Sequence, residues 1–204
     1  AMKDPNAREY VNMALFEGRL GQGIRPDQER FEELQKRAEE DLGTGKYVNI
    51  SLYHGVLNQG IRPEQERFEE LQQRAMKDPN AREYVNMALF EGKLGQGMRP
   101  GYDRFEELQT RAEEDADARE YVYKALYYGA LDQDLRPEQE RFEELKKRAL
   151  KDQNARKYVN MALYRGELGQ GTRPKQERFE ELQKRAVKDC DAQNRVGMAL
   201  YKGR

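Results

Sequence analysis

Cysteine, histidine and serine are scarce in this chain, with one of each among its 204 residues. The lone Cys190 has no partner for an intrachain disulfide, and a metal site built from cysteine and histidine lacks its ligands. No apolar stretch approaches the roughly 18 residues that a membrane-spanning helix needs. Charge of neither sign is in excess, since 37 lysines and arginines face 38 aspartates and glutamates. Such a balance disfavours binding to nucleic acid or to a membrane surface.

These scarcities predict a soluble chain with no metal, no other cofactor and no membrane partner. The first residues, from Ala1 to Pro5, show no charged segment followed by an apolar one, so a signal peptide is not expected. The compartment is not indicated by the sequence.

Residues suited to catalysis do not form a constellation. Ser51 and His54 are three residues apart, but Ser51 takes a position of the buried helical stripe described below while His54 falls on another face. The adjacent Glu32 and Glu33 point about 100° apart on a helix and cannot share one proton or one cation. The Gly21-Gln22-Gly23 loop follows a predicted helix instead of a strand, so it lacks the context of a phosphate-binding loop. We therefore predict that the chain is not an enzyme.

What the chain does contain is an internal repeat. Residues 1–10 recur unchanged as residues 75–84, two periods of 37 residues further on, and weaker copies begin between them and after them. We expect one array over residues 1–204, as a monomer or as a fragment of a longer array. Its predicted copies are 1–37, 38–74, 75–111, 112–148, 149–185 and a terminal half copy, 186–204.

Each copy predicts two helices. The first follows an aspartate present in every copy (Asp4 in copy one), which can cap a helix through its side chain. Its apolar residues recur at the spacing of one helical face, and Gly18 can end it in a left-handed conformation. The second helix follows Pro26, which suits a first helical turn. We expect its core stripe to be Phe31, Leu34 and Ala38, and a solvated face to hold Arg30, Glu33 and Arg37.

One such hairpin buries too little apolar surface to fold alone, so neighbouring hairpins must stack. The predicted fold is accordingly all-α, with about 11 helices in a tandem array of helix-turn-helix repeats, an α-solenoid.

The copies resemble Sel-one-like repeats, which are related to the tetratricopeptide repeats. The matching positions are Ala7, Val11, Gly18, the loop 21–24, and Asp27 followed by Arg37-Ala38. The sequence departs from that pattern at Asn12, where the family often has glycine, and at Leu15, where a tyrosine is expected. The resemblance implies a right-handed superhelix whose first helices line a concave groove, with adaptor or scaffold work and no reaction.

The first helices carry more apolar side chains than one buried stripe requires. Met13 and Phe16 lie on the side away from Ala7, Val11 and Leu15, and the residues of this side change from copy to copy. A surface that recognises a partner can vary in this way, whereas a packing surface repeats one geometry. The predicted partner-binding residues on the concave groove are Glu9, Met13, Phe16, Lys46, Ile50, Tyr53, His54, Glu83, Met87, Phe90, Glu120, Tyr123, Lys124, Tyr127, Tyr128, Lys157, Met161 and Tyr164.

Two features refine this prediction and two alternatives compete with it. Tyr121, Tyr123, Tyr127 and Tyr128 fall on one helix and could anchor an extended peptide. A stripe of Arg8, Asn12 and Phe16 could hold a peptide backbone, although an amide bonded between helices is the favoured use of Asn12. Alternatively, the varied side packs against the next hairpin, or it drifts as plain solvent-facing surface.

A protein-interaction scaffold that binds a protein or a peptide is therefore the leading functional hypothesis. One alternative is RNA binding in the manner of pentatricopeptide repeats, because a Gly-Ile-Arg-Pro-Asp sequence ends at Asp27; the neutral charge argues against it. Another is a designed or consensus scaffold without a natural ligand, which the near-identity of copies one and three allows.

Overall fold

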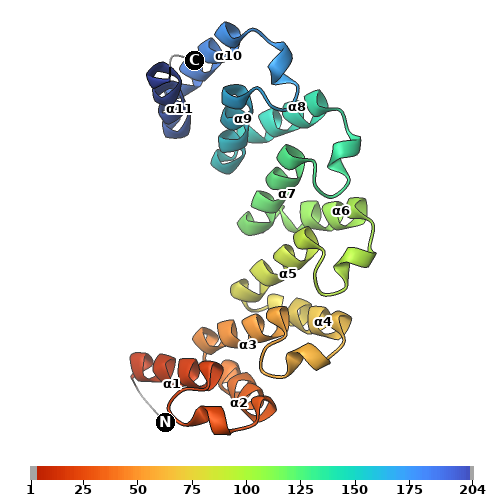
Figure 1. Ribbon diagram of the computed structural model, residues 1–204, viewed down its shortest axis with the longest axis vertical. Coiled ribbons are helices and arrows are strands. Elements are labelled where there is room, and N and C mark those ends of the chain that lie inside the picture. Colours follow the sequence, from red (N-terminus) through yellow and green to blue (C-terminus); the bar gives the residue numbers. More distant parts are fainter. Residues whose placement is uncertain (1–3, 203–204) are drawn as a thin grey trace. The chain divides into compact units, whose positions relative to one another are not determined.

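The computed structural model describes residues 4–202, apart from the side chain of Leu42, and this part of the chain is all-α (Figure 1). Eleven α-helices and five short 3-10 helices, one after each first helix of a complete copy, make up its regular structure. The α-helices are α1 (Pro5–Glu17), α2 (Asp27–Glu40), α3 (Leu42–His54), α4 (Glu64–Ala75), α5 (Pro79–Glu91), α6 (Gly101–Arg111), α7 (Ala116–Tyr128), α8 (Glu138–Ala149), α9 (Gln153–Arg165), α10 (Lys175–Ala186) and α11 (Cys190–Tyr201). The 3-10 helices are η1 (Gln22–Ile24), η2 (Gln59–Ile61), η3 (Gln96–Met98), η4 (Gln133–Leu135) and η5 (Gln170–Thr172).

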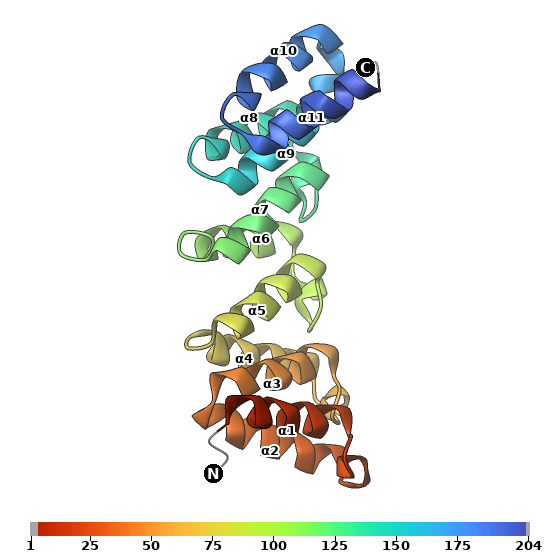
Figure 2. The ribbon, with the colours of Figure 1, turned by 90° about the vertical axis from the view of Figure 1, so that its left-hand side faces the viewer.

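The chain divides into two compact units, Ala1–Arg99 and Pro100–Arg204. In the first unit α1, α3 and α5 pack side by side, and α2 and α4 pack against this row (Figures 1 and 2). In the second unit α9 packs between α7 and α11, and the second helices α6, α8 and α10 pack against this row. The predicted all-α repeat of helix pairs, with its spacing of about 37 residues, is confirmed.

The predicted helix ends are confirmed. The Asp4 side chain accepts a hydrogen bond from the backbone N–H of Asn6 at 2.9 Å, and the equivalent aspartate caps the first helix of every other copy. Gly18 closes α1 at a φ of 71°, in the left-handed region that favours glycine. Pro26 differs slightly from the prediction, because it stands at the N-cap, one residue before α2 begins.

The linker between the helices contains a leucine in a left-handed backbone conformation. Leu94 has a φ of 55° and its side chain is 2 % exposed, and Leu57, Leu131 and Leu168 repeat both features. A non-glycine residue in this region costs about 1–2 kcal/mol. Burial of the leucine side chain contributes a comparable 1.5–3 kcal/mol, roughly, so it offsets this strain.

The core stripe of the second helices is confirmed for Phe31 and Leu34 and most of their equivalents, which are buried, whereas Ala38, the third predicted member, is partly exposed. The prediction that Arg30 belongs to a solvated face is wrong. Arg30 is buried, and its Nη1 donates to the carbonyl of Leu15 at 2.8 Å. Arg67, Arg141 and Arg178 donate to the equivalent carbonyls. The last carbonyls of a helix lack intrahelical donors and carry partial negative charge, which a guanidinium satisfies.

The rest of the predicted charged face is present, since Arg37 Nε lies 2.8 Å from Glu33 Oε1 and both side chains are about one-third exposed. Surface pairs of this kind contribute little to stability, about 0.3–0.5 kcal/mol.

Candidate protein-interaction surface

The first helices of neighbouring copies are joined by buried hydrogen bonds. Asn49 Nδ2 on α3 donates to Asp78 Oδ2, the cap of α5, at 2.8 Å. Asn160 on α9 makes the same bond to Asp189, the cap of α11, at 2.9 Å. In copy four a tyrosine replaces the asparagine, and the Tyr123 hydroxyl donates to the Asp152 cap of α9 at 2.8 Å. Each of these bonds ties one first helix to the start of the next.

In the stripe of Arg8, Asn12 and Phe16, the asparagine amide forms a hydrogen bond between two helices, which is the use favoured from the sequence. Asn12 Nδ2 donates to Thr44 Oγ1 at 2.6 Å across the α1–α3 contact. The arginine equivalent to Arg8 is also engaged in copy three, where Arg82 Nε donates to the carbonyl of Ala75 at 2.8 Å. Asn12 Nδ2 and Arg82 Nε are thus engaged within the chain.

A second set of contacts joins neighbouring first helices through tyrosines. The hydroxyl of Tyr47 donates to Glu9 at 2.8 Å, and that of Tyr158 donates to Glu120 at 2.6 Å. The tyrosine rings also pack against an aromatic side chain of the preceding copy, with the centroids of Phe16 and Tyr47 5.3 Å apart. Burial and then the acceptor carboxylate raise the pKa of Tyr47, so its hydroxyl stays protonated as a donor.

Four of the predicted partner-binding side chains are buried. The exposed fractions are 4 % for Tyr53, 2 % for Tyr123, 6 % for Tyr127 and 8 % for Met161. Tyr53 and Tyr127 stack on Tyr84 and Tyr158 of the following copies. For the three tyrosines, packing against the next hairpin, the alternative considered from the sequence, describes the environment, and Met161 is buried as well. They offer a partner little surface, so the predicted tyrosine anchor of copy four is reduced to the exposed Tyr128 and the partly exposed Tyr121.

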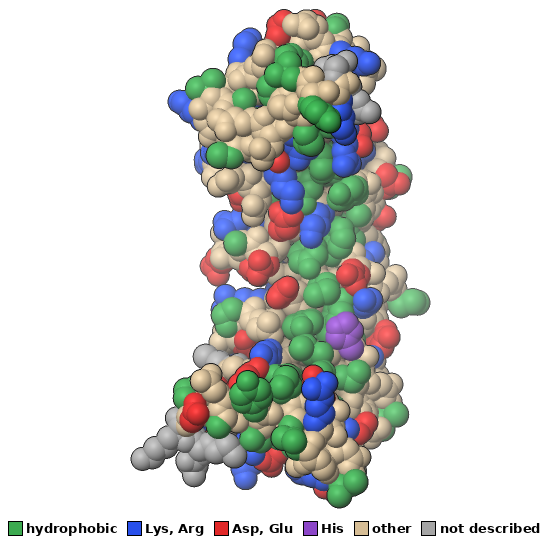
Figure 3. Space-filling view, turned by 60° about the vertical axis from the view of Figure 1, so that its left-hand side comes forward, with side chains coloured by type: hydrophobic (Ala, Val, Ile, Leu, Met, Phe, Trp, Pro, Cys, Tyr) green, Lys and Arg blue, Asp and Glu red, His purple; other side chains and the backbone are tan. Residues whose placement is uncertain are grey.

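In the first unit the remaining predicted residues form an apolar strip with polar neighbours. Met13, Ile50 and Met87 occupy the same position on α1, α3 and α5 and are partly exposed, as are Phe16 and Phe90. His54, the one histidine, is exposed beside hydrophobic side chains (Figure 3).

Charged residues border this strip. Lys46 Nζ lies 2.5 Å from Glu9 Oε1, and this hydrogen bond lowers the pKa of Glu9. Glu83, at the same position of copy three, is exposed. Sequence reasoning missed Glu91, which accepts hydrogen bonds from Tyr53 at 2.8 Å and pairs with Lys93 at 2.7 Å. Its place in the repeat could have indicated it, because Glu91 lies one period of 37 residues after His54 and one before Tyr128, which were both predicted.

In the second unit the accessible predicted residues are more polar. Tyr128 is 64 % exposed at the end of α7, and its ring makes an edge contact with the buried Tyr127. Lys124 takes the position of Met13 and is partly exposed, with its Nζ 4.8 Å from the centroid of the Tyr121 ring. Lys157 is exposed and Tyr164 partly so. The two units thus present different chemistry at equivalent positions.

The structure adds three observations on other functions. Ser51 Oγ is buried and donates to the carbonyl of Tyr47 at 2.7 Å, while His54 is exposed. Within residues 4–202 no three side chains of histidine, cysteine, aspartate or glutamate gather as metal ligands. Among the described helices none combines the length and the apolar character required to span a membrane.

Comparisons of the chain with models of known families, with curated proteins and with solved structures give no match. The class that the structure defines is therefore an all-helical repeat of helix pairs.

Proposed function

We propose that this chain is a protein-interaction scaffold of the Sel-one-like or tetratricopeptide-like kind, which binds an extended peptide of a partner protein on the faces of its first helices. The proposal assigns no reaction to the chain. The observation that carries it is the strip of Met13, Ile50 and Met87, which places a partly exposed apolar side chain at the same position of each first helix in the first unit.

The strip is suited to a peptide for two reasons. The amides of Asn12 and Asn49 and the carboxylate of Glu9 are bonded to neighbouring copies, so these polar groups are already engaged, and the apolar side chains of the strip stay partly exposed beside them. Methionine is unbranched and polarizable and adapts to ligands of different shape. A regular series of such positions fits an extended chain whose apolar side chains recur.

The second unit supports the same use with a different preference. Tyr128 presents an aromatic ring at the end of α7, and tyrosine is enriched among residues that dominate binding energies. Lys124 adds a positive charge one turn earlier on the same helix. We expect the second unit to favour peptides that carry an acceptor or a carboxylate.

A selection of peptides from a random phage library against the purified chain tests the proposal. The selected peptides should lose at least about tenfold in affinity on Ile50→Glu or Met87→Glu if they bind the first unit, and on Tyr128→Ala if they bind the second. Met98→Glu is the matched control, because Met98 is 92 % exposed on η3, away from the first-helix face. Circular dichroism should show equal helicity in all variants.

Two outcomes would contradict the proposal. One is selected peptides that bind every first-helix variant as tightly as the parent chain. The other is binding of mixed single-stranded RNA at low salt that the same variants abolish, which would favour the pentatricopeptide-like alternative.

A further inference from the structure

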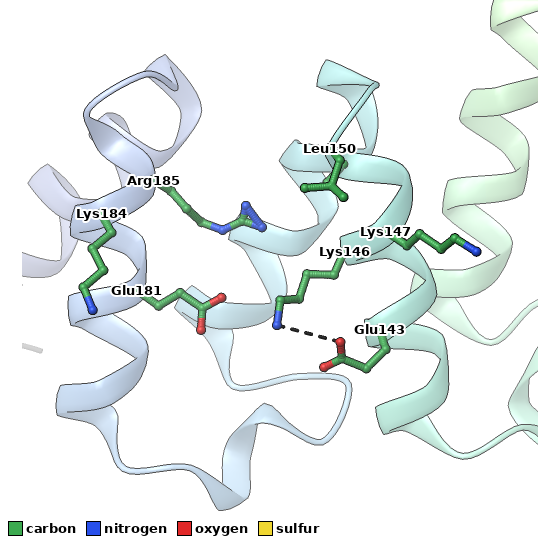
Figure 4. Close-up of a pocket in the computed structure, with 8 residues that line it drawn as sticks. Glu143, Lys146, Lys147, Leu150, Glu181, Lys184 and Arg185 are labelled. Atoms are coloured by element: carbon green, nitrogen blue, oxygen red, sulfur yellow. Dashed lines mark ion pairs between the residues drawn. The ribbon is translucent and has the colours of Figure 1, made fainter.

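A cleft of about 490 Å³ lies between the second helices α8 and α10, away from the first-helix face (Figure 4). Lys146 and Arg185 point into it from opposite sides, and Leu150 lies at one end. Lys147 and Lys184 also line it but extend outward. With Glu143 and Glu181, the lining contains four cations and two carboxylates, a net charge of +2 in a chain whose formal net charge is −1.

Both carboxylates of the cleft already have cationic partners. Glu143 lies 3.7 Å from Lys146 Nζ, and Glu181 accepts a hydrogen bond from Arg173 at 2.9 Å. Arg185, in contrast, is partly buried and has no carboxylate within 4.0 Å among the described residues. Burial lowers its pKa, and the more distant charges of Glu181 and Asp189 oppose this effect. A guanidinium that is partly dehydrated and unpaired is the group that gains most from an added anion.

The equivalent position of the first unit, between α2 and α4, is arranged differently. Gln35 Nε2 donates to Glu70 Oε1 at 2.9 Å and bridges the two helices. Arg74, the counterpart of Arg185, donates to Asn49 Oδ1 at 2.7 Å and is therefore engaged. Glu39 stands where Leu150 stands in the second unit. The open, basic cleft is thus a property of particular residues of α8 and α10 and not of the repeat as such.

We propose that the cleft between α8 and α10 binds an acidic peptide segment of a partner protein, with one carboxylate between Lys146 and Arg185 and an apolar side chain against Leu150. A carboxylate matches the planar guanidinium of Arg185, which can donate two parallel hydrogen bonds. Leu150 is exposed and Ala149 borders the same cleft, so an apolar neighbour of the acidic residue would be buried there.

Nucleic acid fits the cleft less well than an acidic peptide. Single-stranded nucleic acid is bound by aromatic side chains that stack on bases, together with a continuous row of cations. None of the eight residues that line this cleft is aromatic, and its cations are interrupted by Glu143 and Glu181.

The test is an anisotropy titration with a fluorescein-labelled peptide of sequence Glu-Glu-Leu-Glu-Glu-Leu-Glu-Glu. The parent chain should bind it at low salt, and added sodium chloride should weaken the binding. The double variant Lys146→Gln with Arg185→Gln should bind at least about tenfold more weakly, since two charge-assisted contacts are lost. Leu150→Glu, at an exposed position where folding is not at stake, should also weaken binding. The double variant Lys36→Gln with Lys77→Gln, at two exposed lysines of the first unit, is the charge-matched control and should bind as the parent does.

Three results would overturn the proposal: no binding of the peptide by the parent chain at low salt, equal binding by the cleft variants, or a labelled oligouridine that binds this cleft in preference to the peptide. Peptides selected on the first-helix face should be indifferent to all three cleft substitutions. The failure of one proposal is therefore distinguishable from the failure of the other.

Discussion

An asparagine at the same position of the first helix forms different hydrogen bonds in copies two and five. In copy two, Asn49 donates to Asp78 and accepts from Arg74, so its amide is bonded on both sides. In copy five, Asn160 donates to Asp189 and Asp191, but its buried Oδ1 has no hydrogen-bond partner within residues 4–202. Identical residue types at identical spacing thus give a closed network in copy two and an open one in copy five, and Asn12 of copy one shares the open arrangement, since its buried Oδ1 also lacks a partner among the described residues.

This difference separates an asparagine that is bonded on both sides from one that is bonded on one side only. A buried amide with all its partners fixes the position of the next helix, whereas an open network leaves a polar atom and a guanidinium unpaired. Arg74 donates a hydrogen bond to Asn49, whereas Arg185 at the equivalent position lies beside a cleft. The predictions that follow probe this contrast.

Equivalent substitutions in the apolar cores of the two units should lower stability by similar amounts. This result is the reference for the other comparisons. Leu71 on α4 and Leu145 on α8 are both fully buried. Leu71→Ala and Leu145→Ala should each lower the free energy of unfolding by about 3–5 kcal/mol, because each leaves a cavity. Urea denaturation followed by circular dichroism measures the loss. A difference above about 2 kcal/mol between the two variants would mean that packing, and not the polar network, distinguishes the units.

Replacing Asn49 and replacing Asn160 should lower the free energy of unfolding by different amounts. Asn49→Ala leaves Asp78 and Arg74 without their shared partner and should cost about 3 kcal/mol. Asn160→Ala removes fewer bonds, together with an unsatisfied oxygen, and should cost about 1–2 kcal/mol. Urea denaturation of both variants checks the order. Equal losses would break the contrast between a closed and an open network.

The tyrosine hydroxyls should again behave alike in both units. Tyr47→Phe and Tyr158→Phe each remove one hydrogen bond to a glutamate of the preceding copy and keep the ring in place. Each should cost about 1 kcal/mol, at the level of a single hydrogen bond. Thermal unfolding of the two variants is the measurement, and a loss in only one of them would show that this contact is not a general feature of the repeat.

The smallest expected change in stability concerns its pH dependence at acid pH. The hydrogen bond from Lys46 lowers the pKa of Glu9 below its usual 4.5. Its stabilisation is therefore complete above that value and disappears as the pH falls through the folded pKa. In the second unit burial raises the pKa of Glu144, but hydrogen bonds from Arg148 and Arg136 outweigh this and lower it. Unfolding curves between about pH 6 and pH 3 should show a shallower loss of stability in Glu144→Gln, and a smaller change of the same sign in Glu9→Gln.

Local signals predicted the helices well. The capping aspartates, Gly18 and the Phe31-Leu34 stripe act within one helix or one turn, so the sequence order alone determines their role. Arg30 was assigned wrongly because its partner, the carbonyl of Leu15, belongs to the end of another helix. That contact depends on the angle and the distance at which the two helices of the hairpin pack, and the residue pattern of neither helix predicts this geometry.

The candidate site was predicted less completely for a similar reason. Tyr53 and Tyr127 fall on the same face as Met13 and Ile50, and helical periodicity does not separate them. The side chains differ because the first two meet a tyrosine of the next copy, which depends on the distance and the angle between neighbouring hairpins. The cleft beside Arg185 likewise requires two second helices from different copies.

The central claim is that each hairpin is held by its neighbours, and hydrogen exchange on Asn49→Ala tests it most directly. Asn49 on α3 bonds the cap of α5 and the arginine of α4. We predict faster amide exchange in α3, α4 and α5, with α9, α10 and α11 of the second unit unchanged. Faster exchange confined to α3, or an equal acceleration in both units, would contradict the claim.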